Sequence, residues 1–133
     1  MSKITGAHHI AIRTTAFEKS MAFYTDTLGL TLKNQWTRKL GRGALVEIVP
    51  KSYMEIFEDP PASFAGTPVI LHFALRTDDV RGMTERARAA GFPVTVEPFD
   101  VTLDTSIGPM ALTLSFIKGP DGEDIELMTS DIV

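Results

Sequence analysis

Two histidines and two glutamates occupy matching places in two similar stretches of the chain. The phrase HIAIRT begins at His9 and the phrase HFALRT begins at His72. Later in each stretch, YMEIFE and DIELM place Glu55 and Glu126 between apolar residues. Two carboxylates in a partly dry cavity repel each other, and a divalent cation removes that cost. Imidazole with carboxylate, in a chain without cysteine, suits Zn²⁺, Ni²⁺, Co²⁺, Mn²⁺ or Fe²⁺.

Strand geometry predicts which side chains accompany these donors. Side chains of a strand alternate between faces, so His9 shares a face with Arg13, and His72 shares one with Arg76. A lone histidine on a strand is more often structural, and a lone glutamate is more often solvated. The metal interpretation therefore depends on the fourfold match. His8 has the opposite parity and is expected at the surface or at an edge.

The elements that must position these residues also repeat. Residues 9–29 and 72–91 each run from an alternating strand through a helical stretch to a glycine, and three more strand-like pieces follow each. We therefore predict an α+β fold of two tandem βαβββ modules, which form a concave mixed sheet around a metal-binding cavity. The chain, 1–133, is expected to be a single domain. Its modules, 7–58 and 70–129, are joined by a connector rich in proline and glycine.

The starts of the two helices carry capping signals. Thr15, with Glu18 three residues later, fits a capping box for the first helix. Asp78 or Asp79 is expected to cap the second helix. Apolar residues fall on one face of each helix, which predicts that both helices pack against the apolar face of their strands.

Composition excludes several classes of partner. The net charge is −4 and no basic tract is present, which argues against nucleic acid and anionic membranes. No apolar run is long enough for a membrane span, and the N-terminus is too polar for a signal peptide. We expect a cytoplasmic protein whose partner is a small-molecule substrate.

Other residues are candidates for the wall of the pocket. Tyr53, Phe57 and Met128 share a face with the glutamates and are expected to form its apolar part. The segment 33–43 holds several cationic residues and the only tryptophan, Trp36. It either steers an anionic substrate, with Trp36 stacking on it, or is a solvated loop.

Two further features stay open at the sequence level. Arg76 has the same parity as Arg13 and either lines the pocket or forms a structural ion pair. The longer stretch 99–111 of the second module is either a lid with a hinge at Gly108 and Pro109 or an extended hairpin.

The phrases HHIAIR, KSMAFYTDTLGL, YMEIFE, LHFAL and GPDGEDIEL resemble the vicinal oxygen chelate superfamily over nearly the whole chain. This superfamily includes glyoxalase I, fosfomycin resistance proteins, extradiol dioxygenases, methylmalonyl-CoA epimerase and bleomycin-binding proteins. The resemblance implies metal ligands at His9, Glu55, His72 and Glu126. A complete set is most similar to glyoxalase I. Dioxygenases and fosfomycin enzymes typically lack the carboxylate at Glu55, epimerases usually have glutamine there, and bleomycin-binding members generally lack the set.

The resemblance thus implies a lyase or isomerase of glyoxalase I type. It would act through a metal-stabilised enediolate on an adduct of a small 2-oxoaldehyde with a thiol, with Glu55 or Glu126 as the base. An extradiol-type oxygenase and a non-enzymatic drug-binding protein are the alternatives. Arg13 resembles a position that contacts the carboxylate end of glutathione, whereas Asp59 stands where glyoxalase I tends to have asparagine, which leaves the thiol open.

The resemblance also implies a homodimer. The sequence does not distinguish a site built within one chain from a site built across two chains. It also leaves the native metal and the physiological substrate open.

Overall fold

The computed structural model describes residues 1–64, 69–119 and 122–133. The chain forms two compact units. Unit 1 comprises Met1–His8, His72–Leu103 and Pro109–Val133, and unit 2 comprises His9–Leu71 and Asp104–Gly108. Among the described residues, no helix combines the length and the apolar character that crossing a membrane requires.

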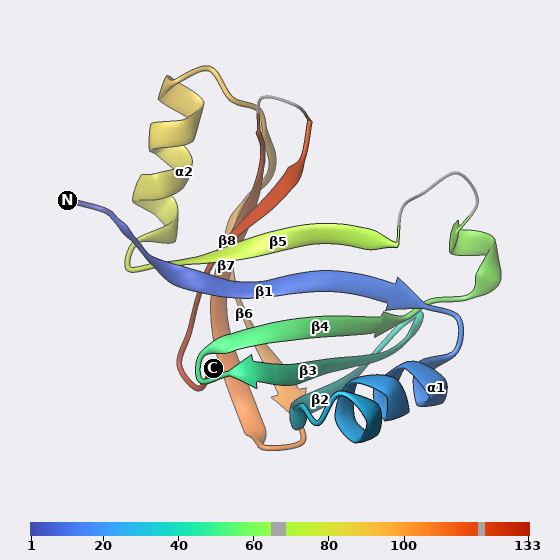
Figure 1. Cartoon of the computed structure of the whole chain (residues 1–133). Helices are drawn as coiled ribbons and strands as arrows, with labels where there is room; N and C mark the ends of the chain where they lie inside the picture. Colours follow the sequence, from blue (N-terminus) through green and yellow to red (C-terminus); the bar gives the residue numbers. More distant parts are fainter. Residues whose placement is uncertain (65–68, 120–121) are drawn as a thin grey trace. The chain divides into compact units, whose positions relative to one another are not determined.

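Eight strands form one mixed sheet in the order β2-β3-β4-β1-β5-β8-β7-β6 (Figure 1). β1 pairs with β4 in parallel, and β5 pairs with β8 in parallel. β3 pairs antiparallel with both β2 and β4, and β7 pairs antiparallel with β8. The α+β class and the repeated βαβββ order are confirmed. The strands are β1 (Ile4–Thr14), β2 (Thr31–Arg38), β3 (Gly41–Val49), β4 (Ser52–Glu58), β5 (Ile70–Thr77), β6 (Val94–Thr105), β7 (Gly108–Lys118) and β8 (Asp124–Ser130).

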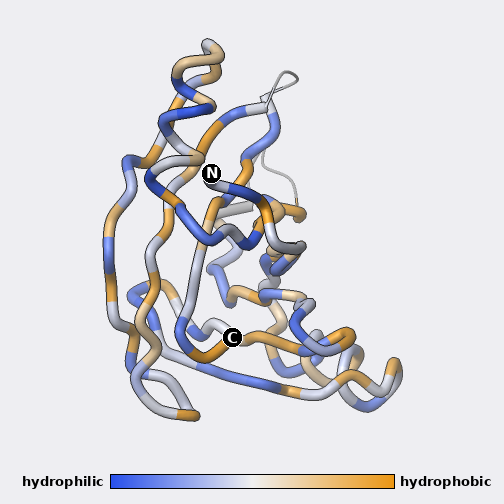
Figure 2. The backbone as a smooth tube through the Cα atoms, turned by 90° about the vertical axis from the view of Figure 1, so that its left-hand side faces the viewer, coloured by the Kyte–Doolittle hydropathy of each residue, from blue (hydrophilic) through white to orange (hydrophobic). Residues whose placement is uncertain are grey.

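The core of unit 2 lies between its strands and the helix α1 (Phe17–Ala22). Its buried residues come from the predicted apolar face, and Figure 2 shows hydrophobic and hydrophilic residues following one another along the strands. This alternation leaves the opposite face of β1 and β4 to polar side chains. The buried core residues are Ile12, Phe17, Ala44, Val46 and Ile56.

The predicted capping box is wrong. Ala16 is the N-cap residue of α1, and no side chain caps it. Instead, the Thr14 hydroxyl accepts hydrogen bonds from the Ala16 N–H at 3.0 Å and from the Ser20 hydroxyl at 2.8 Å. The Glu18 carboxylate is unavailable for capping because it pairs with Arg42 of β3. After α1, the predicted helix continues as a π-helix (Phe23–Thr27).

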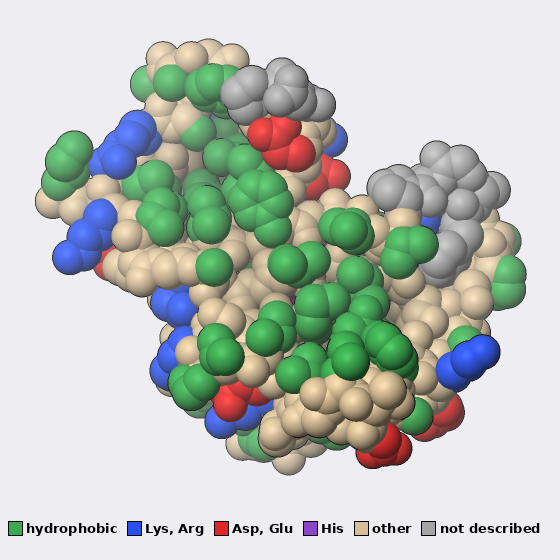
Figure 3. Space-filling view, in the orientation of Figure 1, with side chains coloured by type: hydrophobic (Ala, Val, Ile, Leu, Met, Phe, Trp, Pro, Cys, Tyr) green, Lys and Arg blue, Asp and Glu red, His purple; other side chains and the backbone are tan. Residues whose placement is uncertain are grey.

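The helix α2 (Val80–Ala89) of unit 1 is capped as predicted, by the second of the two candidate aspartates. The Asp79 carboxylate accepts hydrogen bonds from the Ser2 hydroxyl at 2.7 Å and from the Gly82 N–H at 2.8 Å. These bonds lower the pKa of Asp79 below its usual value. Thr84 anchors the middle of the helix, because its hydroxyl lies 2.7 Å from the Ser115 hydroxyl and both residues are fully buried. Figure 3 shows hydrophobic side chains at the surface beside α2.

The stretch 99–111 forms part of a long hairpin, β6 and β7, rather than a lid. The hairpin tip, Asp104–Gly108, belongs to unit 2. Its Ser106 N–H donates to the Gln35 carbonyl at 2.9 Å, and the Gln35 N–H donates to the Ser106 hydroxyl at 3.0 Å. The Ser106 hydroxyl in turn donates to Asn34 Oδ1 at 3.1 Å. The second module therefore supplies a segment that packs on β2 of the first.

The connector contains a 3-10 helix (Pro61–Phe64), and its residues 65–68 lie outside the described residues. The predicted Pro-Asp-Gly turn falls partly at 120–121, which also lie outside them. The predicted module boundaries, 7–58 and 70–129, stay predictions.

Candidate functional site

In unit 2, parallel pairing of two strands brings His9 and Glu55 together. β1 and β4 pair with Ala11 opposite Glu55, so Glu55 lies one step along the same face from His9. The distance between His9 Nε2 and Glu55 Oε1 is 3.2 Å. The His9 side chain is 2% exposed and the Glu55 side chain 13%. The pair is thus largely removed from water.

In unit 1, the second histidine and glutamate form an equivalent pair. β5 and β8 pair in parallel with Ala74 opposite Glu126, which repeats the offset seen in unit 2. The distance between His72 Nε2 and Glu126 Oε2 is 2.9 Å, and the side chains are 11% and 8% exposed. The rings of Phe116 and His72 are nearly perpendicular to each other, with 5.0 Å between their centroids. The repeat seen in the sequence therefore extends to the positions of the donor atoms.

Among the described residues, His9 and Glu55 of unit 2 and His72 and Glu126 of unit 1 are the candidates for holding a metal ion. Each contributes an imidazole nitrogen or a carboxylate oxygen, and the set holds no sulfur. A buried carboxylate is costly unless it is hydrogen-bonded or bound to a cation. Nitrogen and oxygen donors in a largely dry setting fit a borderline divalent ion.

A second polar cluster lies further along the same face of unit 2, at the ends of β1 and β4. Arg13 lies opposite Phe57 in the pairing of these strands. Asp59, which is 8% exposed, pairs with Arg38, and its Oδ2 lies 4.0 Å from Arg13 Nη1. The Arg38 guanidinium also stacks over the Phe57 ring at 4.4 Å from the centroid. One carboxylate is therefore shared by two arginines beside an aromatic ring.

Trp36 is not in a solvated loop. Most of segment 33–43 belongs to β2 and β3, and Trp36 is only 9% exposed. Its ring lies over Gly43, where an added Cβ would be 2.5 Å from Trp36 Cε2. Trp36 also meets Phe57 edge to face, at 6.3 Å between centroids. Glycine at position 43 therefore allows the indole to lie flat on the sheet beside Phe57.

The remaining predicted pocket residues have mixed environments. Tyr53 and Met128 are 2% and 3% exposed, so little of either side chain is accessible. Arg76 donates to the Ala7 carbonyl at 3.4 Å. The expectation for His8 is wrong, because it is 2% exposed. Ile10, which has the same parity in β1, is 43% exposed, so parity alone does not decide which side chains of this strand are buried.

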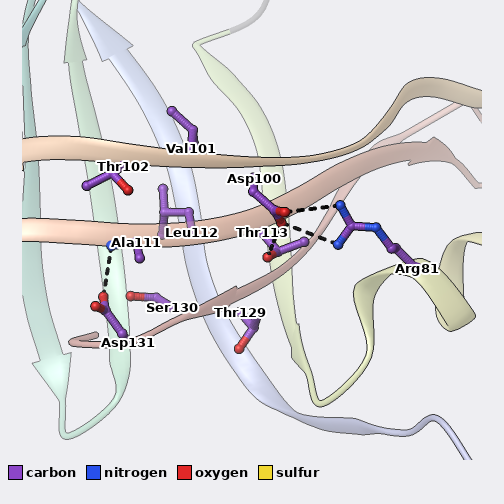
Figure 4. Close-up of a pocket in the computed structure, with 10 residues that line it drawn as sticks. All are labelled: Arg81, Asp100, Val101, Thr102, Ala111, Leu112, Thr113, Thr129, Ser130 and Asp131. Atoms are coloured by element: carbon purple, nitrogen blue, oxygen red, sulfur yellow. Dashed lines mark hydrogen bonds and ion pairs between the residues drawn. The ribbon is translucent and has the colours of Figure 1, made fainter.

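Unit 1 has a separate polar concavity of about 700 Å³ that contains none of the predicted site residues (Figure 4). Arg81 reaches across it to Asp100 at 3.3 Å, and the Thr113 hydroxyl donates to the same carboxylate at 2.7 Å. The Thr113 bond and then the Arg81 pair lower the pKa of Asp100. The Ala111 N–H donates to Asp131 at 2.9 Å. Its charged groups are thus already paired with one another or with the backbone.

Sequence reasoning missed the roles of Asp59 and Arg38 in this arrangement. Asp59 has the parity of Glu55 and Phe57, so its place on their face could have been predicted from the strand. The prolines that follow it suggested only a connector. Arg38 was one of several cations in its segment, and no local signal separated it from the others.

Comparison with known proteins gives concordant matches. The family model described as the Glyoxalase/Bleomycin resistance protein/Dioxygenase superfamily matches residues 6–127. A protein of Vibrio cholerae named probable lactoylglutathione lyase is 30% identical over an alignment of 133 positions, and the match covers 90% of this chain and 87% of that protein. The Arabidopsis thaliana lactoylglutathione lyase GLX1 is 28% identical over 126 residues. That match covers 90% of this chain but 42% of the relative.

The solved structures that are similar in fold include the following two. A methylmalonyl-CoA epimerase of Mycobacterium tuberculosis has a TM-score of 0.71 at 21% identity, and the match covers 94% of this chain and 87% of that one. A hypothetical protein of Bacillus halodurans has a TM-score of 0.74 at 20% identity, with 96% and 93% covered. At these identities the likeness concerns the fold alone.

Proposed function

Because the chain belongs to the glyoxalase/bleomycin resistance protein/dioxygenase superfamily, we propose that it is a metal-dependent lyase or isomerase of glyoxalase I type. Its substrate would be the adduct of a small 2-oxoaldehyde with a thiol, or a related compound. The observation that carries the proposal is the pair of largely buried histidine–glutamate contacts at the same register in both modules.

The proposed metal site consists of His9, Glu55, His72 and Glu126, which together would hold one divalent ion. The neutral imidazoles would present Nε2, the atom that already contacts a carboxylate in each pair. The two carboxylates would neutralise the charge of the ion. The attraction between the ion and the carboxylates would offset the desolvation free energy of keeping both carboxylates ionised away from water. When bound, the ion supplies Lewis-acid stabilisation of the negative charge that develops on the substrate oxygens.

Proton transfer is the part of the reaction that the chain itself performs. A carboxylate would take a proton from one carbon of the substrate and return it to the neighbouring carbon. Glu126 and Glu55 are both candidates, because each supplies the carboxylate of one of the two matching histidine–glutamate pairs. The low exposure of both side chains keeps bulk water from exchanging the proton during the transfer.

The substrate would lie along the face that leads from His9 towards Arg13. Phe57 and Trp36 offer aromatic surface there, and Tyr53 lies opposite His9 in the strand pairing. We assign Arg76 and Met128 to the corresponding face of β5 and β8, which follows from their parity with His72 and Glu126.

The thiol part of the substrate is less constrained. The resemblance implies that Arg13 binds a glutathione carboxylate, but Asp59 lies 4.0 Å from this guanidinium and pairs with Arg38. The negatively charged end of glutathione would therefore have to approach the carboxylate of Asp59. Adducts of methylglyoxal with glutathione and with uncharged thiols should therefore be compared as substrates.

The experiment is a metal-reconstitution assay. Purified protein is stripped with a chelator and reloaded in turn with Zn²⁺, Ni²⁺, Co²⁺, Mn²⁺ and Fe²⁺, and turnover of the methylglyoxal hemithioacetals is followed by absorbance. The proposal predicts activity that depends on the metal and is lost in Glu126→Gln. The exposed Glu85→Gln on α2 is the matched control and should keep full activity. An active chelated enzyme would contradict the proposal.

The alternatives give different results in the same preparations. A protein that takes up no metal under any condition would favour a drug-binding module. Oxygen consumption with a catechol and Fe²⁺ would favour an oxygenase. The predicted homodimer, and whether a site is completed within one chain, can be tested by light scattering and by mixing His9→Ala with His72→Ala protein. Regained activity in that mixture would place the pairs of one site in different chains.

A further inference from the structure

Unit 1 contains an apolar pocket between α2 and the strands beneath it. The first half of α2 is seated on the sheet through Val80 and Thr84, which are 3% and 0% exposed. Further along, Ala87 and Ala90 face the strands with side chains of one carbon. The helix therefore leaves a pocket of about 280 Å³, and Figure 3 shows hydrophobic side chains gathered there.

The walls of this pocket are hydrocarbon. Leu75, Ile117, Ile125 and Leu127 line its floor, and Met83 lines the helix side. No side chain with a carboxylate, amide or hydroxyl group takes part in its lining. An occupant would therefore have to be apolar over the part that enters.

One charged group stands at the rim. Arg86 borders the pocket and is exposed, and its guanidinium donates to the Ser2 carbonyl at 2.7 Å. The other two arginines of α2 both have carboxylate partners, Arg81 with Asp100 and Arg88 with Glu85 and Glu97. Within the described part of the chain, Arg86 has no carboxylate partner. The charge at the mouth of the pocket is thus available to an anion.

We propose that this pocket binds an unbranched aliphatic carboxylate, with the alkyl chain inside and the carboxylate at Arg86. Each buried methylene strengthens binding about fourfold. A volume of about 280 Å³ equals that of roughly nine water molecules at about 30 Å³ each, and a methylene group is of similar size. Affinity should therefore rise with chain length through hexanoate and octanoate and level off beyond decanoate.

The site is separate from the proposed metal ligands. Its floor residues Ile125 and Leu127 flank Glu126 in β8, so their side chains project from the opposite face of the strand. A carboxylate bound at Arg86 therefore does not compete with Glu126 or His72 for a metal. The proposal does not depend on the activity proposed above.

The test uses methyl resonances of methionine in the full-length protein. The chain has six methionines. Among the described residues, Met83 is the only methionine that lines this pocket. Protein with ¹³C-labelled methionine methyl groups is titrated with carboxylates from butanoate to dodecanoate. We expect the Met83 resonance to shift, with a dissociation constant that falls about fourfold per methylene up to the predicted length.

Two variants separate the charge from the cavity. Arg86→Gln should weaken octanoate binding roughly tenfold or more, since hydrogen bonds to charged groups are worth that much, and should leave 1-octanol unaffected. Ala87→Leu fills the pocket and should abolish binding of both ligands. Ala89→Leu, on the exposed side of the same helix, is the matched control and should bind octanoate normally.

The proposal is overturned if no carboxylate in the series moves Met83 at millimolar concentration. It is also overturned if octanoate, 1-octanol and octylammonium bind with the same affinity, because Arg86 then plays no part. Ala90→Leu provides a second filled pocket should Ala87→Leu not fold, and normal octanoate binding by a folded filled variant would equally refute the assignment.

Discussion

Replacing Gly43 with alanine should displace the indole that forms the aromatic wall of the candidate site. The new Cβ would stand 2.5 Å from Trp36 Cε2, 2.6 Å from Nε1 and 2.8 Å from Cζ2. Carbon atoms in contact are normally about 3.5–4.0 Å apart. The ring must therefore move by about 1 Å or more, and its contact with Phe57 must change with it.

The loss of stability in Gly43→Ala can be estimated from the usual effect of adding carbon atoms to a packed site. Forcing additional carbon into a packed site typically destabilises a protein by about 1–3 kcal/mol. With an unfolding entropy of about 2.1 cal/mol/K per residue, a chain of 133 residues has about 0.28 kcal/mol/K. The melting temperature of Gly43→Ala should therefore fall by about 4–11 °C.

Circular dichroism gives the melting temperature, and the emission of the only tryptophan gives the change at the ring. Gly6→Ala is the control, because its Cβ meets nothing nearer than Arg76 Nη1 at 3.4 Å. Trp36→Phe in the Gly43→Ala background should recover part of the loss, since the smaller ring leaves room for the methyl group. An unchanged melting temperature and emission in Gly43→Ala would show that the close contact does not exist.

Four further outcomes are expected. Glu126→Gln should lower turnover by ~10²–10⁴-fold while its circular dichroism spectrum stays native. Thr84→Val should destabilise unit 1 by about 1–3 kcal/mol, because the Ser115 hydroxyl loses its partner in a buried place. Urea unfolding should show that adding Ser115→Ala costs little more. A hydrogen bond from Arg42 lowers the pKa of Glu58 to about 2, from 4.5. The stability advantage of the wild type over Glu58→Gln should thus be complete above pH 4.5 and disappear as the pH falls towards 2. A divalent ion at one hundred times its dissociation constant should stabilise the protein by about 2.7 kcal/mol, and a chelator should reverse the rise in melting temperature.

The repeated architecture was predictable because its signals are local and occur twice. Alternation in HIAIRT and HFALRT assigns faces to His9 and His72, and the same period assigns Glu55 and Glu126. Parallel pairing of the first and last strands of each module then brings each histidine to its glutamate. Their roles as metal ligands stay a prediction that the reconstitution assay tests.

Features that depend on distant residues were not predictable. Thr15 and Glu18 have the spacing of a capping box. The local sequence does not predict that Glu18 instead forms an ion pair with Arg42 of β3. His8 shares its parity with Ile10, which is 43% exposed, yet His8 itself is only 2% exposed. For Glu18, a partner far along the chain outweighed the local rule.

The positions of Trp36 and Arg38 beside the candidate site also depend on residues of neighbouring strands. Trp36 and Arg38 lie in a segment whose charges are typical of a solvated loop. Their packing depends on Gly43 and Phe57, which the strand pairing brings beside them. Register between strands cannot be read from a single segment, so this cluster became visible only in three dimensions.

The contact of Ser106 with Gln35 also protects the outer edge of β2 against pairing with a strand of another chain. β2 ends the sheet on its side, and an exposed terminal strand is a template for pairing with another chain. Ser106 occupies both the N–H and the carbonyl of Gln35, so the middle of that border cannot recruit a foreign strand. A first module made without the β6–β7 hairpin lacks this cover and becomes prone to aggregation.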